Sequence, residues 1–123
     1  MRTLTISALA VFALFVLFTS GCASQGKNFG QPITETTVVG IGDILSHPEQ
    51  FDKKIVRIEG QITDECPAGG WFFLKDKTGL IYVNLHPSEF AIPQAIGKKA
   101  IAQGKVRKEG TQIEVIAQGV ELK

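Results

Sequence analysis

Three aromatic side chains, Trp71, Phe73 and Tyr82, occur in two short apolar runs on either side of the polar residues 76–79, DKTG. Because DKTG ends in a glycine that can take a positive φ, the two runs predict a β-hairpin. If DKTG is the whole loop, Phe73 opposes Tyr82 and Trp71 opposes Asn84, which places all four on one face. The other face carries the expected core residues, Phe72, Leu74, Ile81 and Val83. Trp71, Phe73, Tyr82 and Asn84 are therefore candidate ligand-binding residues.

This aromatic face has two interpretations. Aromatic rings on the outside of a sheet can stack against a flat ligand. Alternatively, residues 41–51, which carry apolar side chains at roughly helical spacing, lie across the rings and bury them in a second small core. An uncovered patch of three aromatics is unusual on a soluble monomer, which favours the second interpretation.

A second group of reactive side chains surrounds Cys66. The hairpin register brings His86 close to the loop that carries Cys66, Asp64 and Glu65. A thiolate, an imidazole and carboxylates could bind Cu(I) or Zn(II), and the dipeptide at 66–67, Cys-Pro, also suggests haem. The spacing matches no established ligand motif, so the alternative is a cysteine packed as a small apolar residue, with no cofactor.

Catalytic arrangements are not evident in the sequence. It shows no Ser/His/Asp pattern and no phosphate-cradling glycine loop, and its two histidines, His47 and His86, each precede a proline as in ordinary turns. We therefore expect a protein that is not an enzyme.

The elements that position these residues are mainly strands. Alternation of apolar and polar residues predicts strands at 54–63, 71–75, 80–85, 98–107 and 112–122. Residues 40–53 predict one helical turn or two short ones around Pro48. Three strands, a mixed turn and two further strands, in an all-β chain, are the order of a five-stranded OB-fold barrel, here with a short N-terminal helix.

The first 21 residues predict a secretory signal, because Arg2 is followed by an uncharged apolar run. Residues 19–22, TSGC, resemble the lipobox of bacterial lipoproteins, although Thr19 stands where that family usually has Leu. The resemblance implies lipid on Cys22 and, since Ala23 replaces the inner-membrane retention residue Asp, an outer-membrane anchor facing the periplasm in a Gram-negative host. The alternative is an uncleaved anchor, but the run at 4–18 is shorter than the roughly 20 residues that span a bilayer.

After removal of residues 1–21, the sequence predicts a flexible, lipidated tether at 22–37 and one domain at 38–123. The removed segment holds one of the 13 basic residues and none of the 12 acidic ones, so the remaining side chains sum to zero net charge. This balance, together with the short turn at 108–111, KEGT, argues against a nucleic-acid partner. Expected partners are the membrane, through Cys22, and a small molecule or an envelope protein.

The segment 41–122 is similar to OB-fold modules of exported bacterial proteins. The similarity lies in IGDILSHPEQFDKKIVRIEGQI and in FFLKDKTGLIYV, which matches the FxLxDxxGxIxV core of those modules. CPAGGWFFLKDKTGLIYV further resembles an uncharacterised periplasmic family with a second cysteine directly before the tryptophan. Gly70 occupies that position here, so a role for paired cysteines is not expected.

Overall fold

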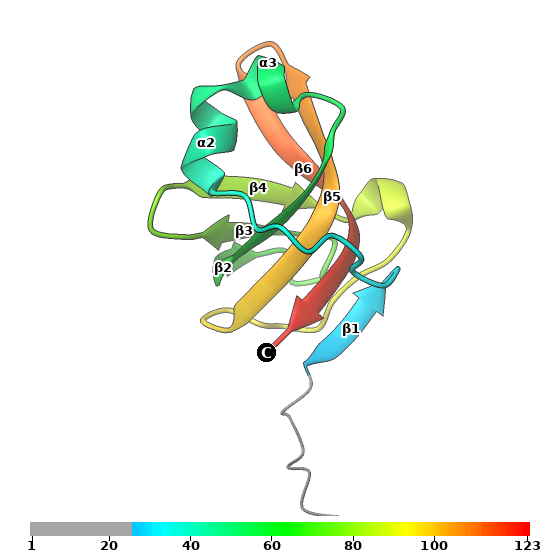
Figure 1. The fold of residues 1–123 in the computed structure, drawn as a ribbon. Helices are drawn as coiled ribbons and strands as arrows, with labels where there is room; N and C mark the ends of the chain where they lie inside the picture. The colour runs from blue at the N-terminus through cyan, green and yellow to red at the C-terminus, as the bar shows by residue number, and fades with distance from the viewer. Residues whose placement is uncertain (1–25) are drawn as a thin grey trace, which may run out of the picture.

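The computed structural model describes residues 26–123; the predicted signal peptide and Cys22 lie outside this range. Within residues 26–123, six strands and three short helices follow one another (Figure 1). They are β1 (Lys27–Gly30), α2 (Ile41–Ser46), α3 (Pro48–Phe51), β2 (Ile55–Glu65), β3 (Trp71–Lys75), β4 (Leu80–Asn84), the 3-10 helix η2 (His86–Ser88), β5 (Lys99–Glu109) and β6 (Gln112–Leu122).

Five of the strands close into a barrel. The order is β2–β3–β4–β6–β5, and β5 also pairs with β2. The β4–β6 pair is parallel and the other pairs are antiparallel. Gly104 lies at a bulge in β5, where an added Cβ would collide with the carbonyl of Ile116, so glycine allows the strand to bend there. The predicted five-stranded barrel is confirmed.

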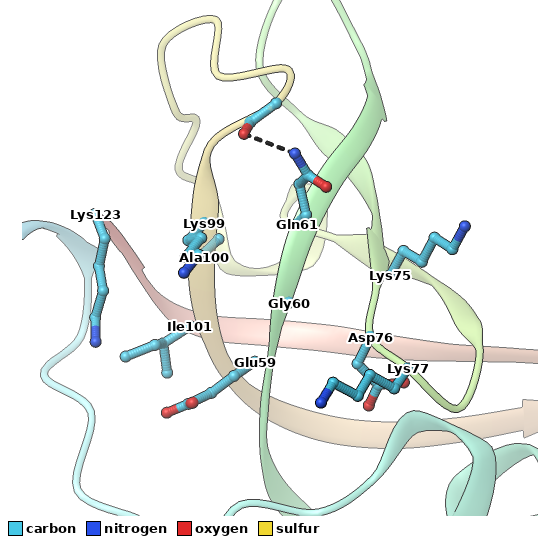
Figure 2. Close-up of a pocket in the computed structure, with 11 residues that line it drawn as sticks. Glu59, Gly60, Gln61, Lys75, Asp76, Lys77, Lys99, Ala100, Ile101 and Lys123 are labelled. Carbon is cyan, nitrogen blue, oxygen red and sulfur yellow. Dashed lines mark hydrogen bonds between the residues drawn. The ribbon is translucent and has the colours of Figure 1, made fainter.

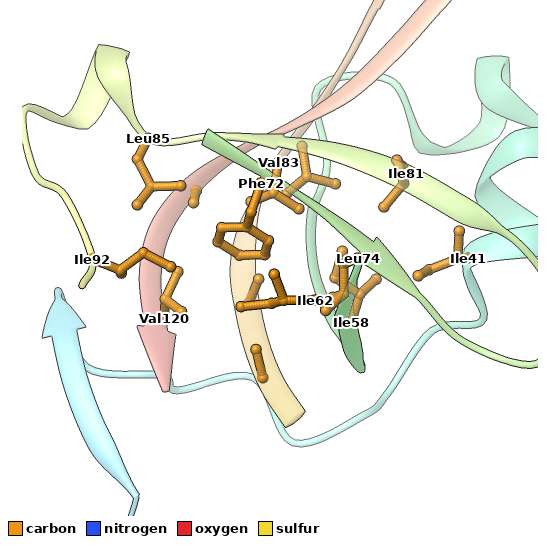
Figure 3. Packing of buried hydrophobic residues seen from close by; sticks show 14 of the residues in the cluster. Ile41, Ile58, Ile62, Phe72, Leu74, Ile81, Val83, Leu85, Ile92 and Val120 are labelled. Carbon is orange, nitrogen blue, oxygen red and sulfur yellow. The ribbon is translucent and has the colours of Figure 1, made fainter. Parts of the chain in front are cut away.

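The barrel interior is filled by the inward-facing side chains of all five strands (Figure 3). The predicted core face of the hairpin is buried in full: Phe72, Leu74, Ile81 and Val83 are each at most 2% exposed. Ile58 and Ile62 of β2 join them, as the alternation predicts. The apolar area removed from water here is the main stabilising contribution to the fold.

The helices α2 and α3 follow each other with a break between them, as predicted for residues 40–53. Pro48 opens α3 at a position where its missing N–H costs nothing, and His47 separates the two helices. Ile41 and Ile44 of α2 enter the main core, and Leu45 packs near Gly79 under the β3–β4 turn. The helix therefore closes one end of the barrel (Figure 1).

The described part of the predicted tether is ordered, which corrects the expectation of a flexible segment up to residue 37. β1 pairs with the last residues of β6, from Lys27 opposite Leu122 to Gly30 opposite Gly119. Farther along, the backbone N–H groups of Thr34 and Glu35 both donate to Oε1 of the buried Gln103 at 2.8 Å. Backbone pairing and one buried amide thus hold a stretch that has no apolar period of its own.

The first barrel strand is also longer than predicted. Asp64 and Glu65, expected in a loop, belong to the end of β2, which continues past a bulge to pair with Phe73 and Phe72. Within residues 26–123, no helix combines the length and the apolar character needed to cross a membrane.

Candidate ligand-binding surface

The hairpin of β3 and β4 has the predicted register. Trp71 opposes Asn84, Phe73 opposes Tyr82 and Lys75 opposes Leu80. Since the residues between them fill the core, Trp71, Phe73, Tyr82 and Asn84 all lie on the outer side of the barrel, where each is half-buried. The sequence therefore brought these four candidate residues together correctly.

The three rings form one cluster. The centroids are 5.9 Å apart for Trp71 and Phe73, 5.7 Å for Trp71 and Tyr82, and 5.4 Å for Phe73 and Tyr82. Phe73 meets both partners edge to face, at 79° and 63°, a favoured arrangement of aromatic quadrupoles. We call Trp71, Phe73 and Tyr82 the aromatic cluster. Its rings hold one another in place and leave part of each ring in solvent.

The N-terminal helix does not cover this cluster. Its buried residues, Ile41 and Ile44, point into the barrel core, to which none of the three rings belongs. Leu45 and the turn around Gly79 meet at the end of the barrel. The interpretation of the aromatic face as a second core under residues 41–51 is therefore wrong, and the face is open.

A hollow of about 540 Å³ adjoins the cluster. We call it the β4–β6 pocket, because the parallel pairing of those strands sets Tyr82 directly beside Glu114. Its walls combine two rings of the cluster with polar side chains and one aliphatic side chain: Phe73, Tyr82, Asn84, Arg107, Gln112, Ile113 and Glu114. Such a mixture of apolar surface and few polar groups is typical of small-ligand sites.

Charges in the pocket are compensated. The guanidinium of Arg107 lies 2.6 Å from the carboxylate of Glu109 and 3.5 Å from that of Glu114. The pKa of the Tyr82 phenol is raised, first because partial burial disfavours the phenolate and then because of the nearby charges of Glu114 and Cys66. Tyr82 therefore remains a neutral hydroxyl at physiological pH, able to donate and to accept hydrogen bonds.

Cys66 lies in the loop between β2 and β3, and His86 begins η2, just after β4. The Cys66 thiol is free and half-buried, and its backbone N–H donates to the carbonyl of Trp71 at 3.0 Å. The His86 ring lies against the Cα of Gly70, so closely that an added Cβ there would overlap it. Gly70 thus leaves the space that the His86 imidazole fills.

The predicted metal set is not brought together. Glu65 turns its carboxylate to the backbone N–H of Ala95, at 2.8 Å, and Asp64 accepts from the N–H of Glu65. Among residues 26–123, no three His, Cys, Asp or Glu side chains are placed so that they could hold one metal ion. The geometry gives no support to a site made of Cys66, His86, Asp64 and Glu65.

Comparison with known proteins decides the fold. No protein-family model and no curated protein matches the sequence. Among solved structures, the hypothetical protein YgiW from E. coli is similar, with 19% identity and a TM-score of 0.51 over 77% of this chain and 97% of that one. A Leishmania major Friedlin protein assigned as an aspartyl-tRNA synthetase has 13% identity and a TM-score of 0.54 over 94% of this chain; the match spans 26% of that chain. This chain is an OB-fold barrel.

Sequence reasoning missed the far wall of the β4–β6 pocket. Arg107, Gln112 and Glu114 come from the β5–β6 hairpin, more than twenty residues after Tyr82. A signal existed, since an OB barrel of this strand order brings its third and fifth strands together. Applied to the alternation of residues 112–122, that rule would have set Glu114 near Tyr82.

Proposed function

We propose that the chain is a non-enzymatic binding protein of the bacterial envelope, which holds a neutral saccharide against the aromatic cluster and in the β4–β6 pocket. One observation carries this proposal: three mutually packed, half-exposed rings border a hollow with polar walls. The site lies on the sheet surface and beside the hairpin loop that OB folds use to bind oligosaccharides and oligonucleotides.

The polar walls favour a sugar over a nucleotide. A sugar ring has a CH face that packs on aromatic rings and hydroxyl groups that pair with amides, carboxylates and phenols. Asn84, Gln112 and Glu114 offer such partners around Tyr82. A nucleotide would also need cations for its phosphate. Arg107, the one cation among the described residues that line this pocket, already faces two carboxylates.

The proposal includes a lipid anchor on Cys22 and an outer-membrane position facing the periplasm. Its support is the lipobox resemblance of residues 19–22 and the apolar run before it. An inhibitor of the lipoprotein signal peptidase should leave the full precursor uncleaved, and Cys22→Ser should abolish labelling by radioactive palmitate. A protein that is cleaved and unlabelled in the presence of Cys22 would overturn this part.

Trp71 provides a direct test of sugar binding, because it is the single tryptophan of the chain. We expect chitotetraose or maltotetraose to change the Trp71 emission saturably in the mature protein. Tyr82→Ala should weaken binding by about tenfold, the equivalent of roughly 1.4 kcal/mol. The matched control is Leu80→Ala, which removes an exposed side chain of the same hairpin outside the pocket.

The experiment has a clear negative outcome. If neither sugar changes the emission at concentrations up to about 10 mM, affinity is too weak to matter and the saccharide proposal is wrong. Equal weakening by Leu80→Ala and Tyr82→Ala would show that the hairpin, rather than the pocket, is being disturbed. Far-UV circular dichroism of each variant checks that the barrel is retained.

A further inference from the structure

A row of lysines crosses the outer surface of the barrel at the end of β6. Gln61 of β2 pairs with Lys75 on one side and with Lys99 on the other. The backbone N–H of Lys123 donates to the carbonyl of Lys99, which adds the next position to the row. Directly opposed residues share a face. The lysine row therefore consists of Lys75, Lys99 and Lys123, with Gln61 between the first two, and all of these side chains are exposed. With strands about 4.8 Å apart, this row is roughly 15 Å long.

The lysine row borders a hollow of about 800 Å³ (Figure 2). Figure 2 shows Lys99 and Lys123 on one side of it and Lys77 on the other, with Gly60 between them. Gly60 is among the lining residues and contributes no side chain to the hollow. Lys75 extends outward from the rim.

The acidic residues of the hollow have partners of their own. Glu59 forms an ion pair with Arg57 at 2.9 Å. Asp76 accepts hydrogen bonds from the backbone of its own turn and from the N–H of Ile41. Among the described residues, none of Lys75, Lys77, Lys99 and Lys123 makes an ion pair. Their ammonium groups are therefore available to external anions.

The chain enters the fold beside this row. Lys27 of β1 is opposite Leu122, and Gly26 lies against the backbone of Leu122. Cys22 precedes Gly26 by four residues, which span at most roughly 14 Å when fully extended. A lipid on Cys22 would thus hold the Lys123 end of the lysine row within about 20 Å of the bilayer surface, with Lys75 at the far end of the row. Had the tether been free to residue 37, no particular surface would face the membrane.

We propose that the lysine row docks on the phosphates of anionic lipids in the membrane that holds the anchor. This inference rests on the proposed lipidation of Cys22. Lysine side chains near an anionic bilayer are attracted to it within about one Debye length, and the anchor keeps these lysines near that range. Docking would set the orientation of the barrel, with the Glu114 wall of the β4–β6 pocket at the opposite end of β6.

Lysine footprinting of the full-length, processed protein tests the proposal. The protein is reconstituted into vesicles of phosphatidylcholine alone or with 30% phosphatidylglycerol as the anionic probe, and acetylation of each lysine is followed by mass spectrometry. We expect Lys75 and Lys99 to react about threefold or more slowly on the anionic vesicles, and the difference to vanish in about 0.5 M salt. Lys105 is exposed, lies opposite Ile55 at the far end of the β2–β5 pair and away from the row, and serves as the internal reference.

Two variants of equal charge change sharpen the test. Lys75→Glu with Lys99→Glu should abolish the lipid dependence of Lys123 acetylation, whereas Lys53→Glu with Lys54→Glu should leave it intact. Equal acetylation rates of Lys75 and Lys99 on both kinds of vesicle would overturn the proposal. The intact mass of the same sample reports lipidation separately. A lipidated protein without protection overturns the docking proposal, whereas a protein whose mass shows no lipid overturns the proposed lipidation and, with it, docking of an anchored protein.

Discussion

The carboxylate of Asp76, in the β3–β4 turn, accepts a hydrogen bond from the backbone N–H of Ile41, the first residue of α2, at 2.9 Å. The other carboxylate oxygen accepts from the N–H groups of Thr78 and Gly79, at 2.7 and 2.9 Å. One side chain therefore shapes the turn and satisfies a free N–H at the start of a helix. The Thr78 hydroxyl makes a second hydrogen bond between the turn and α2, in which it accepts from the N–H of Gly42.

Replacing Asp76 by Ala should lower the free energy of unfolding by about 1–3 kcal/mol, because several backbone donors lose their acceptor. Urea denaturation at neutral pH measures the change. Lys77→Ala, in the same turn and exposed, is the control and should have little effect. An Asp76→Ala protein as stable as the parent would show that water replaces the carboxylate at no cost.

The same carboxylate predicts a pH dependence. Partial burial raises the pKa of Asp76, but hydrogen bonds from Ile41, Thr78 and Gly79 outweigh this effect and hold the pKa below its ordinary value of 3.8. Because the folded-state pKa is depressed, the stabilisation is complete above that ordinary value and is lost as the pH falls through the lower folded pKa. The stability difference between the parent and Asp76→Ala should therefore shrink below about pH 4. A difference that is constant from pH 7 to pH 3 would contradict this assignment.

Gly70 and His86 should behave as a coupled pair. Gly70→Ala puts a methyl group where the His86 ring lies, and overpacking of this kind costs about 1–3 kcal/mol. His86→Ala should relieve most of that cost, so a double-mutant cycle in urea should give a coupling of about 1 kcal/mol or more. Additive effects would mean that the ring moves aside without strain.

β1 depends on a glycine of its partner strand. An added Cβ at Gly119 would collide with the carbonyl of Gln31, whose N–H donates to Gln118 at 2.9 Å. Gly119→Ala should therefore release β1, and amide exchange at Phe29 and Gln31 should accelerate about tenfold or more. Val115, inside the barrel, is the reference amide and should exchange as before. Unchanged exchange at Gln31 would show that the collision is absorbed elsewhere.

The aromatic cluster should be accessible in the empty protein. Since Trp71 is half-buried and the helix lies elsewhere, acrylamide should quench its fluorescence substantially. Leu45→Ala, which trims the side of α2 that meets the turn, should leave the Trp71 emission unchanged. A fully blue-shifted emission that resists acrylamide would instead mean that something covers the rings in solution.

The hairpin was predictable because its determinants are local. The alternation on both sides of DKTG and the length of that loop fix which residues oppose one another, and the pairs from Trp71–Asn84 to Lys75–Leu80 follow directly. The same local logic gave the core face and the break at Pro48.

The errors share a non-local origin. Residues 27–30, KNFG, have no strand pattern, and they form β1 only because the end of β6 offers unpaired backbone groups. Gln103, which accepts from Thr34 and Glu35, lies 69 and 68 positions away from them in the chain. The sequence places Glu65 in a metal-binding loop, but its carboxylate accepts from the N–H of Ala95. That partner lies thirty residues later in the chain and leaves no signal near Glu65. Such partners cannot be deduced from a window of sequence.

The length of β6 sets a height above the membrane for an anchored molecule. Glu114, in the wall of the pocket, and Lys123, in the lysine row, are separated by nine residues of nearly continuous strand, or at most roughly 30 Å. Phe73, in another wall of the pocket, precedes Lys75 by only two residues on the same face of β3, or roughly 7 Å. With the lysine row resting on the headgroups, the pocket would therefore stand on edge, with its Phe73 wall close to the headgroups and its Glu114 wall facing the space above.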